Sequence, residues 1–463
     1  MKTRQGFSSW IDTLRRAFVE FLTFPTLIIL GFLALAVLSY SLDKADIASL
    51  APARNFLKSH VFANAKATSD LLGAIAAGII SVTSITITLL LIVVQQSAAS
   101  MTSQVFDQFL LRKTNQFYFG FFVGLALYSL ITLATVNEPF NPVWGATLAF
   151  LLTVVALSLL VLLLYTTVNQ MRPIEIIEAI RRHILRARER QLPLLQKTRR
   201  ESCFEGTISR QVRSQKSGYV SGLSLETLAK ALQENKGEAE IELTVSLGTF
   251  VAFEDVLAIV KTTDETALET LCSSVVRAVH FDLQRDIDAD AAYGIMQLET
   301  IAWTSISTSK SNPAPGLLTI HSLRDVLARW SHEEAEDKGE KLPVVYVDDV
   351  MEKLLNAFET LAVVSSESMQ HQNYIAVLQT FTVLFDRLPH QWQERAEDMI
   401  LRILSVAGDH APTLTLDQAF EALAEKLRVV GKIKTAVAVE TARQQLLQSV
   451  GKLNSRATRV PGK

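Results

Sequence analysis

Residues 71–96, LLGAIAAGIISVTSITITLLLIVVQQ, decide the fold because this stretch contains no charged residue over a length that can cross a bilayer. About 20 apolar residues, rising roughly 1.5 Å each along a helix, cover a hydrocarbon core about 30 Å thick. The stretch therefore predicts a transmembrane helix.

Polar side chains line one side of this predicted helix. Steps of about 100° per residue place the following residues within one arc: Gly73, Gly78, Ser81, Ser84, Thr88, Gln95 and Gln96. Hydroxyl and amide groups are costly in hydrocarbon unless they meet a partner or water. We expect the polar stripe, defined as Ser81, Ser84, Thr88 and Gln95, to avoid lipid. It faces either a neighbouring helix or a water-filled path, and the sequence leaves both interpretations open.

The composition indicates a membrane part and a soluble part. The chain has 463 residues, of which 49% are hydrophobic and 20% charged, and its mean hydropathy is +0.24. Both features together are unusual for an ordinary soluble protein. The net charge of -2 gives no support for nucleic-acid binding. Cys203 and Cys272 have no metal-binding spacing and fit a reducing compartment, so we expect no metal and no cofactor.

Three further spans follow from the same reasoning. We expect an amphipathic interfacial helix over residues 1–23 and a transmembrane domain over 24–170, with spans at about 24–42, 71–94, 117–136 and 144–168. Gly120 and Gly124 lie four residues apart in the third span, a spacing that lets two helix backbones approach closely. They predict helix packing there.

The basic residues predict the topology. Lysines and arginines flank the N-terminal segment, the 112–113 loop and the region after Arg172, whereas the loop after Val136 has none. The positive-inside rule therefore places both termini in the cytoplasm. The 43–70 loop has mixed charge and argues weakly against this assignment.

A basic segment over residues 171–216 follows the last span as a juxtamembrane helix and linker. Its cluster consists of Arg181, Arg182, Arg186, Arg188 and Arg190. Such a cluster beside a membrane attracts anionic lipid head groups. A solvated helix end that merely obeys the topology rule is an equally open interpretation.

The rest of the chain predicts a mainly helical α+β cytosolic domain. We expect an α+β part over 217–316, with strands near 218–220, 240–246 and 256–260, a helix capped by Ser224, and another running from Thr262 through about His280. A helical region over 317–454 and a disordered tail over 455–463 follow. The predicted fold class is thus an α-helical membrane protein with four transmembrane helices and this cytosolic domain.

No nucleotide loop, zinc motif or nucleophile elbow is present, so we expect a protein that is not an enzyme. One acidic cluster resembles a calcium loop: His280, Asp282, Asp286, Asp288 and Asp290. Ala291 stands where that loop needs glycine, and Gln297 where it needs a bidentate glutamate. The pattern favours helix caps and solvated charges over a metal site.

Two stretches resemble a family of bacterial predicted membrane proteins, the domain of unknown function 2254. The first is SVTSITITLLLIVVQQSAASMTSQVFDQFLLRKTNQFYFGFFVG, from residue 81. The second combines SGYVSGLSLETLAKAL, IELTVSLGTFV and QRDIDADAAYGIMQLETIAW. The resemblance spans roughly 20–330 and implies a four-span protein of the bacterial inner membrane, without an activity to carry over. The chain departs from the family pattern after Trp303, where a first proline is missing and Asn312 is followed directly by Pro313.

These observations lead to two functional hypotheses. The first is a homo-oligomeric channel or solute conduit, lined by the polar stripe and regulated by the cytosolic domain. The second is a membrane-anchored interaction or signalling scaffold, in which the stripe packs the four spans together. Lipid is the expected partner in both, with anionic head groups at the arginine cluster.

Overall fold

The structure is a computed structural model of the chain, and it describes most of the sequence. The described residues are 22–45, 50–100, 113–170, 172–204, 208–235, 237–307, 312–332, 341–407, 410 and 412–448. The chain divides after Glu175 into two compact units, which we call the membrane unit and the C-terminal unit. The amphipathic helix predicted over 1–23, up to residue 21, and the tail predicted over 455–463 lie outside the described residues.

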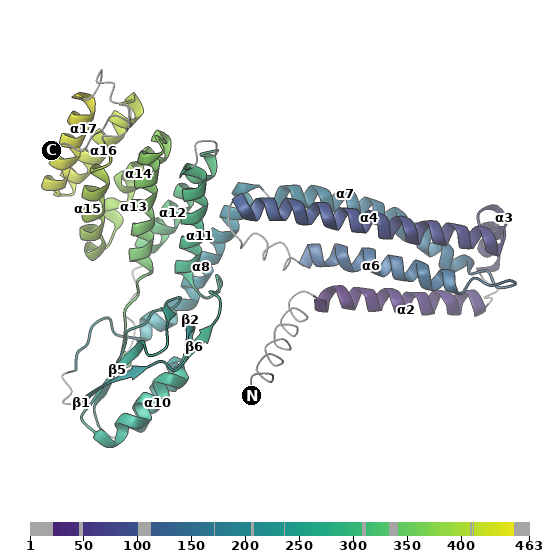
Figure 1. Cartoon of the computed structure of the whole chain (residues 1–463), viewed down its shortest axis with the longest axis horizontal. Helices are drawn as coiled ribbons and strands as arrows, with labels where there is room; N and C mark the ends of the chain where they lie inside the picture. The colour runs from purple at the N-terminus through teal and green to yellow at the C-terminus, as the bar shows by residue number, and fades with distance from the viewer. Residues whose placement is uncertain are drawn as a thin grey trace. The chain divides into compact units, whose positions relative to one another are not determined.

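Four helices of the membrane unit are long and apolar enough to cross a bilayer, and a short helix lies between the first two. In chain order the helices are α2 (Thr23–Ala45), α3 (Ala51–His60), α4 (Ala65–Ser100), α6 (Lys113–Ala134) and α7 (Val143–Gln170) (Figure 1). The predicted fold class, with four membrane-spanning helices, is therefore confirmed. Helix α4 begins at Ala65, before the predicted span, and Asn64 Oδ1 accepts a hydrogen bond 2.7 Å long from the Ala67 N–H in its first turn.

Helix α6 is the centre of the membrane unit. It packs against α2, α4 and α7, and 56% of its apolar window is buried, against 17% for α7. The rings of Phe32 on α2 and Phe121 on α6 meet edge to face with centroids 5.3 Å apart. The core of this unit is therefore the set of side chains that surround α6.

The C-terminal unit begins within α8 (Pro173–Lys197), at Ile176, and contains two small sheets with two helices. Its strands and remaining helices up to residue 282 are β1 (Ile208–Arg213), β2 (Gly218–Leu223), α9 (Leu225–Glu234), β3 (Ala239–Leu243), β4 (Phe250–Val251), β5 (Val256–Thr262), the 3-10 helix η3 (Glu265–Ala267), α10 (Leu268–Ala278) and β6 (Val279–Asp282). The first sheet has the order β1-β5-β3-β7, in which β7 (Val344–Tyr346) comes from later in the chain and is parallel to β3, and the second has the antiparallel order β4-β2-β6. Ser224 caps α9 as predicted, accepting a hydrogen bond from the Thr227 N–H.

A stack of helices completes the C-terminal unit (Figure 1). Its elements are α11 (Ala291–Ser307), α12 (Ala314–His332), β7 (Val344–Tyr346), α13 (Val350–Glu367), α14 (His371–Leu384), η4 (Phe385–Arg387), α15 (His390–Leu404), α16 (Leu414–Val429) and α17 (Ile433–Gln448). Helices α11, α13, α15 and α17 contact one another in succession, and so do α12, α14 and α16. This two-layer order of helix pairs is that of an α-solenoid.

The structure differs from the sequence predictions at several boundaries. In the segment expected as a juxtamembrane helix and linker over 171–216, the helix α8 continues to Lys197 and strand β1 follows, which pairs with β5. His280 lies in strand β6 rather than in a helix, because α10 ends at Ala278. Strand β7 interrupts the region expected to be purely helical and joins the first sheet beside β3. The α+β part and the helical stack therefore share one compact unit.

Candidate functional site

The polar stripe lies on the outer surface of α4. Ser81, Ser84, Thr88 and Gln95 are all exposed, and the Thr88 hydroxyl donates a hydrogen bond 2.9 Å long to the Ser84 carbonyl oxygen. The same face continues toward the start of the helix with further exposed residues, namely Asp70, Ala74 and Ala77. Together with exposed Leu91 these positions alternate by three and four residues, a period of 3.5 that is typical of helices packed along a left-handed seam.

This face of α4 differs from the outer faces of the neighbouring spans. Most exposed residues of α7 are large and apolar, for example Val161, which is 68% exposed, and α2 exposes Leu27 and Val37, which are 66% and 67% exposed, along with small residues such as Ala34 and Ser41. Side chains of that kind suit acyl chains, whereas small and hydroxyl-bearing residues are typical of helix interfaces in membranes. The polar stripe is thus an outward line of small and hydroxyl-bearing residues, flanked on α4 by the exposed Ile80 and Ile85.

The stripe does not pack the four spans of one chain together, as the scaffold hypothesis expected, because its residues are exposed. The side of α4 that faces α6 and α7 is mainly apolar and includes Leu72, Ile75, Ile79 and Leu90. Two hydroxyls that the sequence analysis did not single out also lie inward. Thr86 is buried, and within the described part of the chain the buried Thr83 Oγ1 has no hydrogen-bond partner.

The glycine pair of α6 lies at the contact with α2. A Cβ atom on Gly120 would come within 3.0 Å of Pro25 Cα, and one on Gly124 within 2.9 Å of Phe32 Cγ. Both distances are shorter than ordinary carbon contacts, so the absence of a side chain lets the two helices approach closely. Gly120 and Gly124 therefore lie at the α2–α6 interface.

A second polar cluster in the membrane unit was not anticipated from the sequence. Asp43, near the end of α2, is only 2% exposed, and its two carboxylate oxygens each accept a hydrogen bond 2.9 Å long, from the N–H groups of Trp144 and Gly145 at the start of α7. The Tyr128 hydroxyl lies 3.1 Å from both Ser39 Oγ and the Gly145 carbonyl oxygen. The only signal in the sequence was an acidic residue directly after an apolar run.

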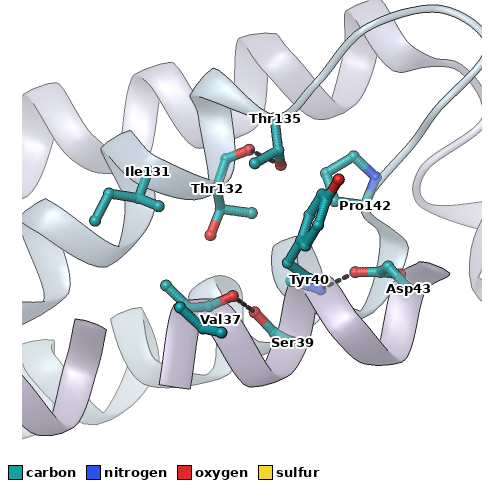
Figure 2. A pocket seen from close by; sticks show the side chains of 10 residues that line it. Val37, Ser39, Tyr40, Asp43, Ile131, Thr132, Thr135 and Pro142 are labelled. Carbon is teal, nitrogen blue, oxygen red and sulfur yellow. Dashed lines mark hydrogen bonds between the residues drawn. The ribbon is translucent and has the colours of Figure 1, made fainter. Parts of the chain in front are cut away.

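A pocket of about 200 Å³ lies beside this cluster. Figure 2 shows Val37 and Ile131 at one end of it and Asp43 at the other, with Tyr40 and Pro142 nearer the carboxylate. An acidic side chain that is buried in a membrane-spanning segment is costly and usually functional. The Asp43 pocket is therefore a second candidate site.

The arginine cluster of α8 is largely engaged within the C-terminal unit. Arg181 pairs with Glu178 on its own helix and with Asp325 on α12, and Glu178 consequently has a lowered pKa. Arg188 lies 2.8 Å from an Asp348 carboxylate oxygen and over the Trp330 ring. The expected head-group role does not fit these two arginines, because their partners are acidic residues of the same unit.

Three arginines of the cluster remain on the surface. Arg182, Arg186 and Arg190 are exposed, although Arg190 Nη1 donates a hydrogen bond 3.0 Å long to the Asp288 carbonyl oxygen. The opposite side of α8 is buried through isoleucines, and Gly294 of α11 leaves room for Ile184. Helix α8 is therefore a core element of this unit, with a basic outer edge.

The acidic cluster over 280–290 is distributed over separate structural roles. His280 and Asp282 lie in β6, opposite Gly222 and Tyr219 of β2. Asp286 Oδ1 accepts a hydrogen bond from the Asp288 N–H, and the Asp288 carboxylate pairs with His183 of α8. Within the described ranges of the chain, no three His, Cys, Asp or Glu side chains are placed to hold a metal ion.

Asp290 links the start of α11 to a neighbouring loop. Its Oδ1 accepts a hydrogen bond from the Tyr293 N–H, and its Oδ2 lies 2.8 Å from Nε of Arg285. Burial raises the pKa of Asp290, while Arg285 and the Tyr293 N–H act in the opposite direction. Gly248, with a φ of +80°, lies against this ion pair, so the turn after β3 requires a glycine both for its backbone and for the available space.

Comparison with known proteins gives a single family. A family model described as "Predicted membrane protein (DUF2254)" matches residues 19–375, which confirms the resemblance and extends it beyond the expected 330 into α14. The matched range includes the polar stripe, the Asp43 pocket and α8. No curated protein and no solved structure matches significantly.

Proposed function

Because the chain belongs to this family of predicted membrane proteins, whose function is unknown, we propose that it forms a homo-oligomeric conduit lined by the polar stripe of α4. The observation that carries the proposal is that Ser81, Ser84, Thr88 and Gln95 share one exposed face of a membrane-spanning helix. In a monomer these groups would face acyl chains, which is unfavourable for hydroxyl and amide groups.

A second copy of the chain is the partner best suited to shield the polar stripe from lipid. The small residues Ala74, Ala77 and Ser81 on the exposed face allow close approach of another α4, and their 3.5-residue period keeps two such helices in register. When several copies surround a common axis, the hydroxyls of the central part of α4 line that axis. Uncharged oxygen atoms can replace part of the hydration shell of a small solute or ion.

Cysteine accessibility tests the conduit. In a background with Cys203 and Cys272 replaced, single cysteines at Ser81, Ser84 and Thr88 should react with a small hydrophilic thiol reagent in intact membranes. Cysteines at the buried Ile79 and at Ile80, which is exposed but lies off the stripe, serve as matched controls and should stay unlabelled.

Flux measurements test the same proposal independently. Reconstituted protein, shown to be folded, should conduct ions or release a small entrapped solute from vesicles, and Ser84→Leu should reduce that flux. An absence of any flux, together with uniform protection of the three stripe cysteines, would refute the conduit. Crosslinking between copies through those same cysteines without water access would instead mean a dry interface.

The scaffold remains the second candidate, and the two-layer helix stack favours it. Stacked helix pairs present extended surfaces that suit protein partners. In that case the outward stripe holds copies of the membrane unit together without a path. Fold alone does not specify a function, so the accessibility pattern along α4 decides between the two.

We further propose a non-enzymatic role in the bacterial inner membrane with both termini in the cytoplasm. The distribution of lysine and arginine along the chain supports this orientation. It would place the exposed Arg182, Arg186 and Arg190 on the side that carries anionic head groups. Replacing Arg182 and Arg186 by alanine should reduce the phosphatidylglycerol that co-purifies with the protein, whereas Lys230→Ala, at a residue whose side chain is 78% exposed, should not. A reporter fused after residue 60 that proved cytoplasmic would refute the orientation.

A further inference from the structure

The Asp43 pocket has the chemistry of a site for a positively charged head group. We propose that it binds the primary ammonium group of an aminophospholipid of the phosphatidylethanolamine class, which enters from the bilayer. This site is formed by α2, α6 and the start of α7, and it is separate from the polar stripe on α4. The proposal therefore does not depend on a conduit.

The carboxylate of Asp43 retains acceptor capacity. The N–H groups of Trp144 and Gly145 occupy one position on each oxygen, and an ionised carboxylate offers about four acceptor positions. Two hydrogen bonds hold the group in place, and its negative charge remains at the edge of the pocket. A donor with a positive charge complements this arrangement.

Three hydroxyl groups that line the pocket, apart from that of Tyr40, act as acceptors toward a ligand. Ser39 Oγ donates to the Ala36 carbonyl oxygen at 3.1 Å, Thr132 Oγ1 to that of Tyr128 at 2.8 Å and Thr135 Oγ1 to that of Thr132 at 2.7 Å. Each hydroxyl hydrogen is thus used by the backbone, and what each oxygen offers a ligand is its lone pairs. Such a set favours a ligand with several N–H donors and disfavours an anion.

The position of the pocket favours a lipid over a solute dissolved in water. Val37 is 67% exposed and Ile131 is 38% exposed, so the apolar end opens on the side surface of two membrane-spanning helices. Figure 2 places these two side chains at the end away from Asp43. An acyl chain can leave through that end while the ammonium group stays at the carboxylate.

A cationic side chain lies next to the acidic end. Arg54 of α3 donates a hydrogen bond 3.3 Å long to the Asp43 carbonyl oxygen. A zwitterionic head group carries its phosphate only a few bonds from its ammonium group, so the carboxylate and this guanidinium match its two charges. The Tyr40 ring packs against that of Phe140 in a tilted arrangement with ring centroids 5.5 Å apart, and aromatic side chains of this kind are typical of the head-group level.

The test uses the full-length protein in a maltoside detergent with short-chain lipids of identical acyl length. Dihexanoyl phosphatidylethanolamine should raise Tm, with an apparent affinity at least tenfold greater than that of the phosphatidylcholine or phosphatidylglycerol analogue. Phosphatidylcholine carries the same charges but no N–H donor, and phosphatidylglycerol lacks the cation. Asp43→Asn should abolish the shift.

A second variant is needed because Asp43 also holds the start of α7. Val37→Trp adds bulk at the exposed end of the pocket and leaves the carboxylate unchanged, so it should keep the Tm of the lipid-free protein and lose the shift. Equal shifts from the three lipids, or an undiminished shift in Val37→Trp, would overturn the proposal. A Tm shift caused by hexylammonium but not by phosphatidylethanolamine would refute the proposal that the ammonium group belongs to a lipid.

Discussion

Replacing Gly248 by alanine should open the contact between the turn after β3 and the start of α11. The added Cβ would lie 2.6 Å from Asp290 Cγ and 2.7 Å from Arg285 Nη2, so the buried ion pair must move. Both members are well shielded, with side chains 13% and 6% exposed for Arg285 and Asp290. Breaking a buried pair costs about 3–5 kcal/mol. The φ of +80° adds about 1–2 kcal/mol for a residue with a side chain.

Gly431→Ala provides the matched control. Gly431 has a φ of +83°, and a Cβ there meets nothing within 4 Å, so this variant carries the backbone cost alone. Both substitutions also restrict the unfolded chain equally, and that term cancels between them. The two variants should therefore differ by about 3 kcal/mol in the free energy of local opening, which corresponds to roughly a 100-fold difference in the equilibrium constant for opening.

Native-state hydrogen exchange of the full-length protein measures this opening. Peptides that cover residues 244–250 and the first turns of α11 should lose about two orders of magnitude more protection in Gly248→Ala than the α16–α17 turn loses in Gly431→Ala. If the two variants lost protection within about threefold of each other, the Arg285–Asp290 pair would contribute little, and the reasoning from buried charge would be refuted.

Three further substitutions test other contacts. Gly124→Ala should weaken the α2–α6 packing by about 1–3 kcal/mol and lower Tm, whereas Gly31→Ala, with open space around its Cβ, should not. In urea unfolding, Arg188→Ala should destabilise the C-terminal unit by about 3 kcal/mol because it leaves a mostly buried aspartate unpaired, and the exposed Arg186→Ala should cost less than about 0.5 kcal/mol. The hydrogen bond from Arg443 lowers the pKa of the Asp417 carboxyl below 3.8. The ionised carboxyl therefore contributes to folding stability above about pH 4, and this contribution is lost as the pH falls through the lowered pKa. Hydrogen exchange of α16 and α17 should therefore accelerate on acidification more in the wild type than in Asp417→Asn.

The sequence alone predicts the membrane-spanning helices, but it does not predict which helices each of them packs against. Length and hydropathy specify a crossing helix without reference to the rest of the chain, so all four were predictable. Periodicity located the polar stripe on one side of its helix. It could not state which side of α4 faces α6, because that depends on contacts such as Leu72 and Ile79 with residues far along the chain.

The features of the C-terminal unit that the sequence analysis did not predict also depend on residues far along the chain. Strand β7 has only three residues, too few to show alternation, and it exists because β3 offers a free edge for parallel pairing. The arginines of α8 read as a membrane-facing cluster because charge density carries no information about partners. Asp325 and Asp348, more than a hundred residues later, account for two of them.

In the membrane unit, the two candidate sites depart from the distribution of polar and apolar side chains that a bilayer favours for a single chain. An isolated spanning bundle should place apolar side chains outward, yet α4 exposes Ser81, Ser84 and Thr88 while Asp43 is enclosed. The enclosed carboxylate is explained locally, because the first N–H groups of α7 donate hydrogen bonds to it. Within the described residues, these outward hydroxyls lie exposed rather than packed against a neighbouring span, and Thr88 bonds only to the backbone of its own helix. The cost of leaving them in lipid therefore favours association through α4, whether the assembled surface is wet or dry.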